Sequence, residues 1–334
     1  MILDKYVIIS PEFGLEKGGI QTWAYYIYKL LKERAKDVSS FGVRELSILS
    51  IGHFFRTILF ANKYILMTWK MSLFIYPLLY WNKKTFYIFI HGNDFLNLNI
   101  IYDRILKHIL SRNNVLVISN SNFITNLFEN HYKYKADLTC YPFIDTHVNM
   151  DIDNDERDMS FFTVTRLVRR KNIHSVIRAI YELSLENVHV KYYIAGEGPE
   201  KEYLKKLVVS FHLEDSVIFL GKISEKEKEI YLKRVSYFIL PSLFDEKNAS
   251  IEGYGIVYIE ANLYGLPVIS GNTGGMPEAV INNVTGLVTD GSVSEIKDAI
   301  IKIQKMKYDK KAIISFARKH DYRSQNNFWI LITK

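Results

Sequence analysis

The sequence predicts an α/β protein built from two domains, each with a parallel sheet covered by helices on both faces. Short apolar strands alternate with helical segments along the chain, beginning with the strand YVIIS and the helix IQTWAYYIYKLLKER. Continuous apolar strands separated by helices are typical of buried parallel sheets. There are more of these βαβ units than one sheet comfortably holds, and 334 residues are enough for two domains. We therefore expect two Rossmann-like, doubly wound domains.

The strands are assigned from runs of β-branched and aromatic residues that end at turn-forming residues. In the first half these runs are YVIIS, TFYIFIHG and NVLVISN, and in the second half they are MSFFTVTRL, HVKYYIAG, SVIFLG, SYFILPS, LPVISG and GLVTD. Helical patterns separate them, which is the arrangement expected of a parallel sheet.

The most apolar segment of the first half is 46–82. It predicts a helix, a strand at Tyr64–Trp69 and a second helix at Met71–Trp81, because it leads into the strand TFYIFI. Arg56 and Lys70 interrupt it, and its longest charge-free run is too short to span a membrane. Two interpretations stay open: core packing against the sheet, and contact with a membrane surface, since aromatic and basic residues alternate here.

A change of composition marks the domain boundary. The stretch CYPFIDTHVNMDIDNDERDMS passes from a proline to acidic residues before a new strand, which places a linker at 146–158. The predicted domains are 1–150 and 151–312, and 313–334 is expected to form a helix that crosses back to the first domain. The DIDND sequence resembles a metal-binding pattern only superficially, because no helix or strand would fix its carboxylates.

The net charge of +7 is concentrated in the first half of the chain. Residues 1–150 carry 17 Lys and Arg against 11 Asp and Glu, whereas residues 151–334 carry 26 against 25. A basic half suggests an anionic partner such as lipid head groups or a phosphate, although an ordinary soluble basic face explains it equally well. The single cysteine, Cys140, excludes an intramolecular disulfide, and no secretory signal is visible. A cytoplasmic setting is therefore expected.

The stretch IEGYGIVYIEANLYGLPVI places Glu252 and Glu260 eight positions apart around a glycine turn. Gly253 and Gly255 precede a predicted helix that ends at Gly265, so bare amides and the positive end of the helix dipole meet at this turn. Such a turn can hold phosphate or sugar oxygens, and an ionised carboxylate can accept from two vicinal hydroxyls. A capping glutamate plus a surface glutamate is the alternative. The apolar residues around Glu260 disfavour this alternative, because a solvated charge is unexpected among them.

A basic cluster follows the first strand of the second half. Arg166, Arg169, Arg170 and Lys171 stand between this strand and an amphipathic helix. Cations at the carboxyl end of a strand suit a diphosphate, and we select Arg166 and Lys171 because both fall in the loop. The alternative is an ordinary basic helix start, which the helix dipole disfavours.

Three further positions are weaker candidates for ligand contacts. Gly19 opens a helix, where backbone can approach a ligand closely, and His91 ends a strand on the ligand side of an open sheet. A structural role for His91 remains the alternative. The GEGP turn at 196–199 is found in many α/β proteins.

These stretches together resemble retaining glycosyltransferases of family 4, the glycosyl transferases group 1. The stretches that carry the resemblance are GGIQTWAYYIYKLL, HGND, VISNSNFITNLF, RLVRRKN, IAGEGPEKEYLKKL, VIFLGKIS, FILPSLFDE and IEGYGIVYIEANLYGLPVISGNTGGMPEAVINNVTGLV. The resemblance is specific in the second half and loose in the first. It implies the GT-B fold, in which two Rossmann-like domains face each other across a cleft.

The resemblance also implies roles for individual residues. Glu260 would hold the ribose of a nucleotide sugar, and Glu252 would face the transferred sugar. Arg166 and Lys171 would neutralise the leaving diphosphate, and His91 would lie near the reacting sugar. The remaining donor contacts would come from Gly19, Lys222, Ile223, Gly253, Tyr254, Gly255 and Ile256.

The predicted function is retaining transfer of a sugar from a UDP- or GDP-sugar to a hydroxyl of a saccharide acceptor. No metal and no other cofactor are expected, because two cations and helix-end amides would stabilise the diphosphate. We further expect a lipid-linked acceptor, peripheral contact with an anionic membrane and no binding of nucleic acid. The pathway expected is O-antigen or capsule synthesis. A nucleotide-sugar 2-epimerase, a glycogen-synthase-like polymerase and a non-catalytic sugar-nucleotide-binding subunit remain alternatives. Extra polar residues in FDEKNASIEGYG depart from the family pattern.

Overall fold

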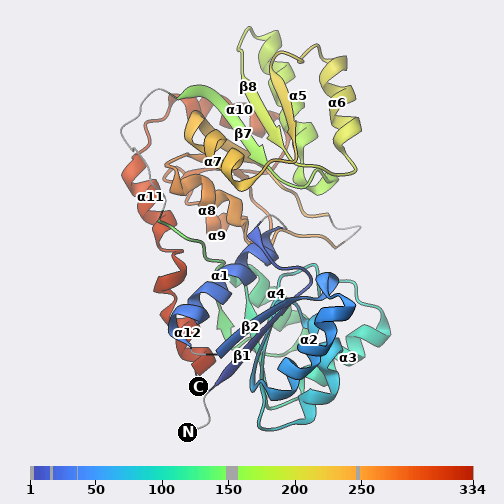
Figure 1. Ribbon diagram of the computed structural model, residues 1–334. Coiled ribbons are helices and arrows are strands. Elements are labelled where there is room, and N and C mark those ends of the chain that lie inside the picture. The colour runs from blue at the N-terminus through green and yellow to red at the C-terminus, as the bar shows by residue number, and fades with distance from the viewer. Residues whose placement is uncertain (1–3, 16–17, 36, 148–156, 246–248, 334) are drawn as a thin grey trace. The chain divides into compact units, whose positions relative to one another are not determined.

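The computed structural model describes residues 4–15, 18–35, 37–147, 157–245 and 249–333 (Figure 1). The chain divides into two compact units. Unit 1 combines Met1–Asp145 with His320–Lys334, and unit 2 is Thr146–Lys319. Each unit is built on its own six-stranded sheet. The sequence prediction put the first boundary at 150 and the return at 313, whereas the chain divides at 145 and again at 320.

The sheet of unit 1 is parallel throughout and runs in the order β2-β1-β3-β4-β5-β6. In its register Ile8 pairs with Ser40 on one side and with Ile65 on the other. The edge strand β2 and the two-residue β6 were not predicted, since β2 reads DVSSFG and lacks an apolar run. The strands are β1 Lys5–Ser10, β2 Asp37–Gly42, β3 Lys63–Leu66, β4 Thr85–Ile90, β5 Val115–Ser119 and β6 Leu138–Thr139.

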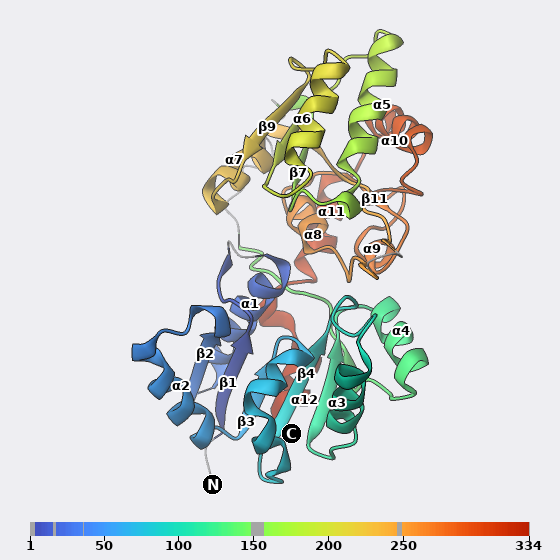
Figure 2. The ribbon, with the colours of Figure 1, turned by 90° about the vertical axis from the view of Figure 1, so that its right-hand side faces the viewer.

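Helices cover both faces of this sheet. The first helix and the last one lie on one face, and α2 and α3 lie on the other (Figures 1 and 2). The core of the unit includes Trp23 from α1 and Phe328 from α12, and Trp329 packs against it. The helical segments are α1 Gly19–Arg34, η2 Val43–Glu45, α2 Ile48–Phe60, η3 Trp69–Tyr80, α3 Ile100–Leu110, α4 Asn122–Tyr132, η5 Tyr322–Ser324 and α12 Asn326–Thr333.

The apolar segment 46–82 was predicted correctly as helix, strand and helix, but two details were wrong. The strand ends at Leu66 rather than at Trp69, and η3 is a 3₁₀ segment instead of an α-helix. The backbone of η3 leaves helical geometry at Ile75, two residues before Pro77. Proline has no amide hydrogen to donate and its ring obstructs the preceding turn, which explains why no regular α-helix forms.

The segment 313–334, expected to cross back to the first domain as one helix, belongs to unit 1 from His320 onward and is divided into separate helices. α11 (Lys310–Arg318) ends in unit 2, and two shorter helices follow it. Asp321 pairs with Ile144 in a parallel bridge, which joins the returning segment to the end of the first one. A proline-free polar stretch, KHDYRSQNN, lies where the helix was expected to continue.

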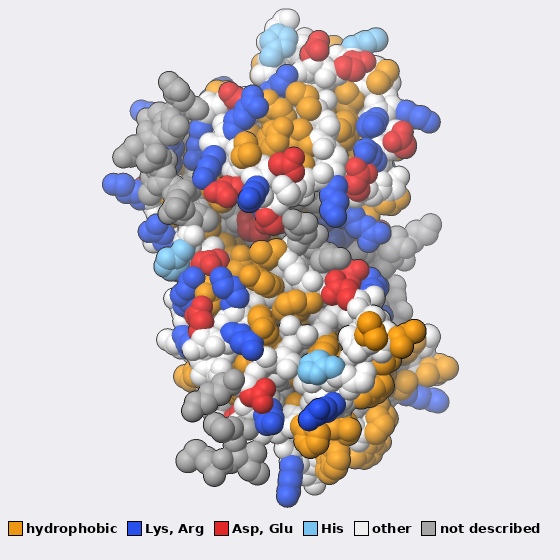
Figure 3. All heavy atoms as spheres, viewed as in Figure 1, with side chains coloured by type: hydrophobic (Ala, Val, Ile, Leu, Met, Phe, Trp, Pro, Cys, Tyr) orange, Lys and Arg blue, Asp and Glu red, His pale blue; other side chains and the backbone are white. Residues whose placement is uncertain are grey.

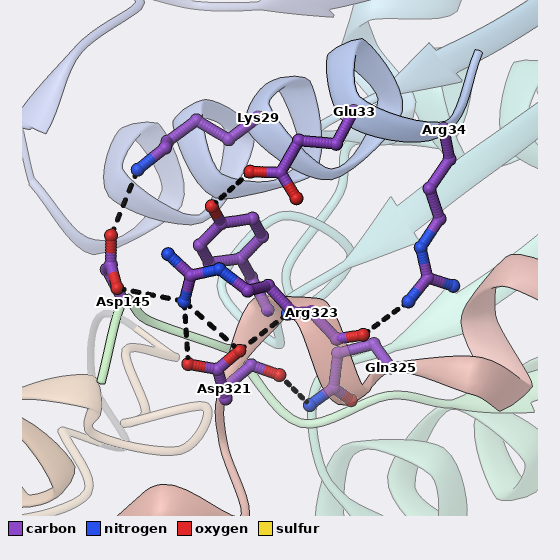
Figure 4. Close-up of polar contacts among 8 residues, drawn as sticks. Lys29, Glu33, Arg34, Asp145, Asp321, Arg323 and Gln325 are labelled. Carbon is purple, nitrogen blue, oxygen red and sulfur yellow. Dashed lines mark hydrogen bonds and ion pairs between the residues drawn. The ribbon is translucent and has the colours of Figure 1, made fainter. Parts of the chain in front are cut away.

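Ion pairs fasten this segment to α1 (Figure 4). Asp145 accepts from Lys29 and from Arg323, each at 3.0 Å, and Arg323 also pairs with Asp321 at 3.0 Å. The Tyr322 hydroxyl donates to Glu33 of α1. These contacts make the last residues of the chain an integral part of unit 1.

The sheet of unit 2 is also parallel and runs in the order β12-β11-β10-β7-β8-β9. The six strands predicted from the second half are all present. They are β7 Asp158–Val164, β8 Lys191–Ala195, β9 Val217–Gly221, β10 Val235–Leu240, β11 Val268–Gly271 and β12 Gly286–Thr289. The central strands β7, β10 and β11 are largely buried, as expected where helices cover both sides of the sheet, whereas the edge strand β9 is mostly half-buried.

The helices of unit 2 pack on this sheet and on each other (Figure 2). α10 packs against α5, and α11 packs against α8. The helical segments are η4 Arg169–Lys171, α5 Ile173–Leu185, α6 Lys201–Ser210, α7 Glu225–Arg234, α8 Ile256–Leu263, α9 Met276–Ala279, α10 Val293–Lys305 and α11 Lys310–Arg318. Within the ranges that the structure describes, no helix has the length and hydropathy needed to cross a membrane. Most of the predicted linker, including DIDND, lies outside the described residues.

Candidate active site

The candidate site of unit 2 lies where the order of its strands reverses. From β7 the chain adds β8 and β9 on one side, and it later adds β10, β11 and β12 on the other. The loops after β7 and β10 therefore leave the sheet side by side at its carboxyl edge. In open α/β sheets ligands bind at this position. The basic cluster follows β7, and Glu252 follows β10.

Glu252 joins these two loops through a pair of cations. Its Oε2 accepts from Arg170 Nη1 at 2.7 Å and from Lys171 Nζ at 2.5 Å. The three side chains are only 11–18% exposed. Charge-assisted hydrogen bonds in such a sheltered place are among the strongest polar contacts in proteins. The sequence predicted Lys171 and Glu252 as site residues, whereas Arg170 was named in the basic cluster but was not selected.

The electrostatics of this cluster follow from burial and charge together. Burial by itself would raise the pKa of Glu252, but the Lys171 and Arg170 charges and their hydrogen bonds outweigh it and lower that pKa to about 2. Burial lowers the pKa of Lys171, with Arg170 adding to the effect and Glu252 opposing it. The cluster therefore holds an ionised carboxylate against two donors.

The backbone of the Arg170–Lys171 turn is anchored from two directions. The Arg170 carbonyl accepts from the Leu243 amide at 2.8 Å, in the loop after β10. Asn172 is fully buried with a left-handed φ of 60°, and its side-chain amide donates to the Gly291 carbonyl at 2.7 Å. Asparagine tolerates this conformation better than most residues, so it lets the 3₁₀ turn pass directly into α5.

The two glycines of the GEGP turn support the same loop by close backbone packing. A Cβ on Gly196 would lie 1.8 Å from the Thr165 carbonyl oxygen, and one on Gly198 would lie 2.2 Å from that of Leu167. The Leu167 amide donates to the Glu197 carbonyl at 2.9 Å. These glycines are thus needed to seat the loop that carries the cations.

The loop that carries Glu252 is fixed by the TGGMPE stretch. The Glu252 carbonyl accepts from the Gly275 amide at 3.0 Å, and a Cβ on Gly274 would come within 2.3 Å of the same oxygen. Upstream, Asp245 and Ser250 exchange two backbone hydrogen bonds of 2.9 Å. This pairing closes the polar insertion into a short loop ahead of Glu252. Residues 246–248 lie outside the described part of it.

The turn after Glu252 opens α8 without a side-chain cap. Gly255 takes a left-handed φ of 95° at the N-cap, and the first turn of the helix holds no acidic residue. Gly253, Tyr254 and Ile256, also predicted as donor contacts, are buried in this turn. The amides at the start of α8 thus have no side-chain acceptor from the cap position, which suits an anionic or hydroxylated ligand.

Glu260, one turn into α8, pairs with a lysine that sequence reasoning missed. Its Oε1 accepts from Lys228 Nζ of α7 at 3.1 Å, and Lys228 also pairs with Glu225 at 2.7 Å. Burial opposes the charge on Lys228, but the two carboxylates outweigh it and raise its pKa. A lysine 32 positions before its partner gives no sequence signal, because only the packing of α7 and α8 brings the two together.

Three other predicted donor contacts are more open. Arg166 is exposed and makes no ion pair with any residue that the structure describes. Lys222, just after β9, is exposed, and Ile223 beside it is half-buried. All three leave the same carboxyl edge of the sheet as Lys171.

In unit 1, His91 is placed at the end of β4 as predicted, but both of its ring nitrogens are engaged within the unit. Nε2 lies 2.7 Å from the Met67 carbonyl oxygen, and Nδ1 lies 3.3 Å from the Asn120 side-chain nitrogen. Because a carbonyl only accepts, Nε2 carries the proton and Nδ1 accepts. Burial lowers the pKa of this histidine. Gly19 opens α1 after Gly18, whose φ is 128°, and the helix has no side-chain cap.

The comparison with protein families decides the assignment. The family model described as glycosyl transferases group 1 matches residues 150–320, which is more than half of the chain. The chain belongs to the glycosyl transferases group 1 family. The match spans unit 2, so the cluster of Arg170, Lys171, Glu252 and Glu260 lies entirely within the matched region.

Individual curated proteins are similar to this chain over part of its length. A GDP-mannose-dependent alpha-(1-6)-phosphatidylinositol monomannoside mannosyltransferase of Mycobacterium tuberculosis is 36% identical over 141 residues, covering 42% of this chain and 37% of that protein. The amylovoran biosynthesis glycosyltransferase AmsK of Erwinia amylovora is 29% identical over 161 residues, covering 48% and 39%. The aligned region is thus less than half the length of these relatives.

The fold of the whole chain matches that of solved GT-B glycosyltransferases. The crystal structure of HepE from Anabaena in complex with UDP and glucose aligns with a TM-score of 0.73 and 18% sequence identity, covering 99% of this chain and all of that one. The predicted GT-B fold, with two Rossmann-like parallel-sheet units, is confirmed.

Proposed function

We propose that this protein is a retaining glycosyltransferase that moves a sugar from a UDP- or GDP-sugar to a hydroxyl of a saccharide acceptor. The observation that carries the proposal is the charged cluster at the strand reversal of unit 2. There Glu252 contacts Arg170 and Lys171, and Glu260 lies eight residues further on, one turn into α8. Its chemistry fits a ligand that combines a diphosphate with vicinal hydroxyls.

Lys171 and Arg166 are the proposed partners of the donor diphosphate. Lys171 has three donor hydrogens and donates one of them to Glu252, so the others can reach a diphosphate. Arg166 has no ion-pair partner among the described residues. Arg170 would keep Glu252 in position while Lys171 turns to the diphosphate. Lys222 and Ile223 would contact the base, Glu260 the ribose, and the residues from Gly253 to Ile256 the sugar hydroxyls.

The proposed reaction breaks the bond between the anomeric carbon and the diphosphate oxygen. The acceptor oxygen bonds to the anomeric carbon on the same face, and its proton passes to the departing diphosphate. Retention of configuration follows, and Glu252 need not act as a nucleophile. Because cations and the amides of α8 would stabilise the developing charge, we propose that transfer needs no divalent metal.

The acceptor is proposed to be a lipid-linked saccharide on the inner face of the plasma membrane, with no role for nucleic acid. The M. tuberculosis relative is named for a phosphatidylinositol acceptor, and AmsK for the synthesis of a polysaccharide. The basic charge of residues 1–150 is consistent with such an acceptor. We therefore propose a cytoplasmic, peripheral enzyme of surface polysaccharide synthesis, such as O-antigen or capsule. In this proposal unit 1 binds the acceptor, His91 lies near the reacting sugar, and Gly19 approaches the donor diphosphate.

A screen for donors tests this function. Thermal unfolding in the presence of UDP-, GDP-, ADP- and CMP-sugars should show stabilisation by one UDP- or GDP-sugar, since a ligand of the native state alone raises stability. With that donor and an oligosaccharide acceptor, NMR should show a product whose anomeric configuration equals that of the donor, with EDTA present. Acceptor-independent consumption of the donor would favour an epimerase, and binding without turnover across many acceptors would favour a non-catalytic subunit.

A further inference from the structure

Helix α2 turns its apolar side chains outward, which is the reverse of an ordinary surface helix. Only Phe54 and Ile58 of this helix are buried, at 3% and 4% exposure. One stripe on the outer side of the helix consists of Ile48, Phe55 and Leu59. Phe55 follows Ile48 by seven residues and Leu59 follows Phe55 by four, and side chains at these spacings lie on the same side of an α-helix. The large apolar residues exposed on α2 are Ile48 (93%), Leu49 (95%), Ile51 (44%), Phe55 (50%), Leu59 (53%) and Phe60 (69%).

The neighbouring segment η3 continues this surface. Lys84 Nζ donates to the Leu59 carbonyl at 2.9 Å and lies 5.2 Å from the centre of the Trp81 ring, so Trp81 stands beside the end of α2. Trp81 and Tyr80 are 55% and 52% exposed. Figure 3 shows hydrophobic side chains gathered over the part of unit 1 that carries α2 and α3. We name the exposed residues of α2 together with Tyr80, Trp81 and Lys83 the α2–η3 face.

The charges on this part of the chain have one sign. No Asp or Glu occurs between Glu45 and Asp94, although this stretch contains five cations. Arg56 and Lys83 are exposed, and neither makes an ion pair with any residue that the structure describes. Exposed cations on a stretch of chain that has no carboxylate of its own attract an extended anionic partner. It also opposes pairing with a second copy, because a two-fold interface would bring like charges together.

We propose that the α2–η3 face binds the surface of an anionic phospholipid bilayer, with α2 lying in the plane of the interface. The apolar stripe would enter the boundary between head groups and acyl chains, as amphipathic interfacial helices do. Trp81 and Tyr80 have the amphipathic rings that are enriched at this depth, and Arg56 can extend its guanidinium to the phosphates. The proposal assigns the peripheral membrane contact of the proposed function to one defined surface, and it holds for this chain whether or not the donor is a nucleotide sugar.

Flotation of the intact protein with vesicles tests the proposal. Wild-type protein should float with vesicles of phosphatidylcholine mixed with phosphatidylglycerol, should float much less with phosphatidylcholine alone, and should be released by high salt. Leu49→Ser/Phe60→Ser and Arg56→Glu/Lys83→Glu should each lower the partition coefficient at least about tenfold, because one removes apolar area and the other reverses two charges. Leu185→Ser and Lys226→Glu are matched controls on exposed positions of unit 2 and should float like wild type.

Tryptophan fluorescence supplies a second readout. Of the four tryptophans, Trp23 and Trp69 are buried and Trp329 is half-buried against the core of unit 1, so quenching by brominated lipid should come mainly from Trp81 and should fall strongly in Trp81→Phe. Vesicle binding that is independent of phosphatidylglycerol, or unchanged binding of the Leu49→Ser/Phe60→Ser variant, would overturn the proposal. Self-association without lipid that this variant abolishes would instead assign the face to a second copy.

Transfer assays with a water-soluble acceptor separate this inference from the proposed function. Variants of the α2–η3 face should keep wild-type thermal unfolding and wild-type transfer to such an acceptor while losing vesicle binding. Wild-type protein that binds anionic vesicles but transfers no sugar would refute the proposed function and would still support membrane docking.

Discussion

The cations of the candidate site in unit 2 and those of the α2–η3 face in unit 1 are held in opposite ways. Lys171, Arg170 and Lys228 are sheltered and each contacts a carboxylate, whereas Arg56 and Lys83 are exposed with no ion-pair partner among the described residues. Sheltered pairs fix geometry and are screened little by salt, while exposed charges act at a distance and are screened strongly. The first arrangement suits a small anion in one defined pose, and the second suits an extended anionic surface.

The largest effect expected from this difference is on catalysis by unit 2. Lys171→Ala and Arg166→Ala should each lower kcat roughly 10²–10³-fold, the scale of losing one donor to a developing negative charge. Steady-state assays of sugar transfer, with the donor identified by thermal shift, measure the kcat of each variant. Arg169→Ala is the matched control, since Arg169 is exposed and contacts Glu200 at 3.5 Å. Activity within twofold of wild type in the Lys171 variant would remove that residue from the mechanism.

The next effect is on stability, through the carboxylate that the two cations share. Glu252→Gln should lower the free energy of unfolding by about 3 kcal/mol near neutral pH, because it leaves two sheltered cations without their anion. The pKa of Glu252 falls from 4.5 to about 2 on folding, so its contribution is complete above pH 4.5 and is lost as the pH falls toward 2. Urea unfolding should therefore show a deficit for the variant that shrinks in acid.

The same substitution should strengthen the binding of the nucleoside diphosphate product. In Glu252→Gln no internal carboxylate competes with the diphosphate for Lys171, so UDP or GDP should bind on the order of tenfold more tightly while transfer is lost. Isothermal calorimetry measures this change. Unchanged or weaker binding would show that the diphosphate does not meet this cluster.

A smaller effect is expected at Glu260, where one carboxylate would serve the ribose. Glu260→Gln should weaken UDP or GDP binding about tenfold, the scale of one charge-assisted hydrogen bond, and should leave pyrophosphate binding unchanged. Glu225→Gln is the matched control because Glu225 contacts the same lysine, Lys228, from a more exposed position. Equal losses in both variants would assign Glu260 a structural role.

The smallest effect concerns His91 in unit 1, whose two ring nitrogens both have hydrogen-bond partners. Its folded pKa is lowered, so the unfolded state binds more protons near pH 6 and His91 contributes to the loss of stability as the pH falls below 6.5. His91→Gln should cost about 1 kcal/mol at pH 8 and should flatten this dependence. Nitrogen-15 NMR should show a neutral ring with the proton on Nε2, and a charged ring at pH 7 would contradict the assignment.

Most of the fold followed from local sequence, and the errors have local causes too. The strands of unit 2 were found because each is an uninterrupted apolar run, whereas β2 was missed because two serines lie in the middle of DVSSFG. The helix expected over Met71–Trp81 forms as a 3₁₀ segment with a break at Ile75, because Pro77 prevents regular α-helical hydrogen bonding. For the apolar segment 46–82 the sequence left burial and surface exposure open, and the structure buries β3 but exposes α2.

Local sequence was enough to establish the alternation of strands and helices, the glycine turn between Glu252 and Glu260, and the presence of Lys171 after β7. The tertiary structure alone decided that Arg170 contacts Glu252, that Lys228 reaches Glu260, and that α2 faces outward. The physical reason is that periodicity and turn chemistry act between neighbours along the chain. Contacts between residues 32 to 82 positions apart depend on which strands lie side by side, and only the folded sheet establishes that order.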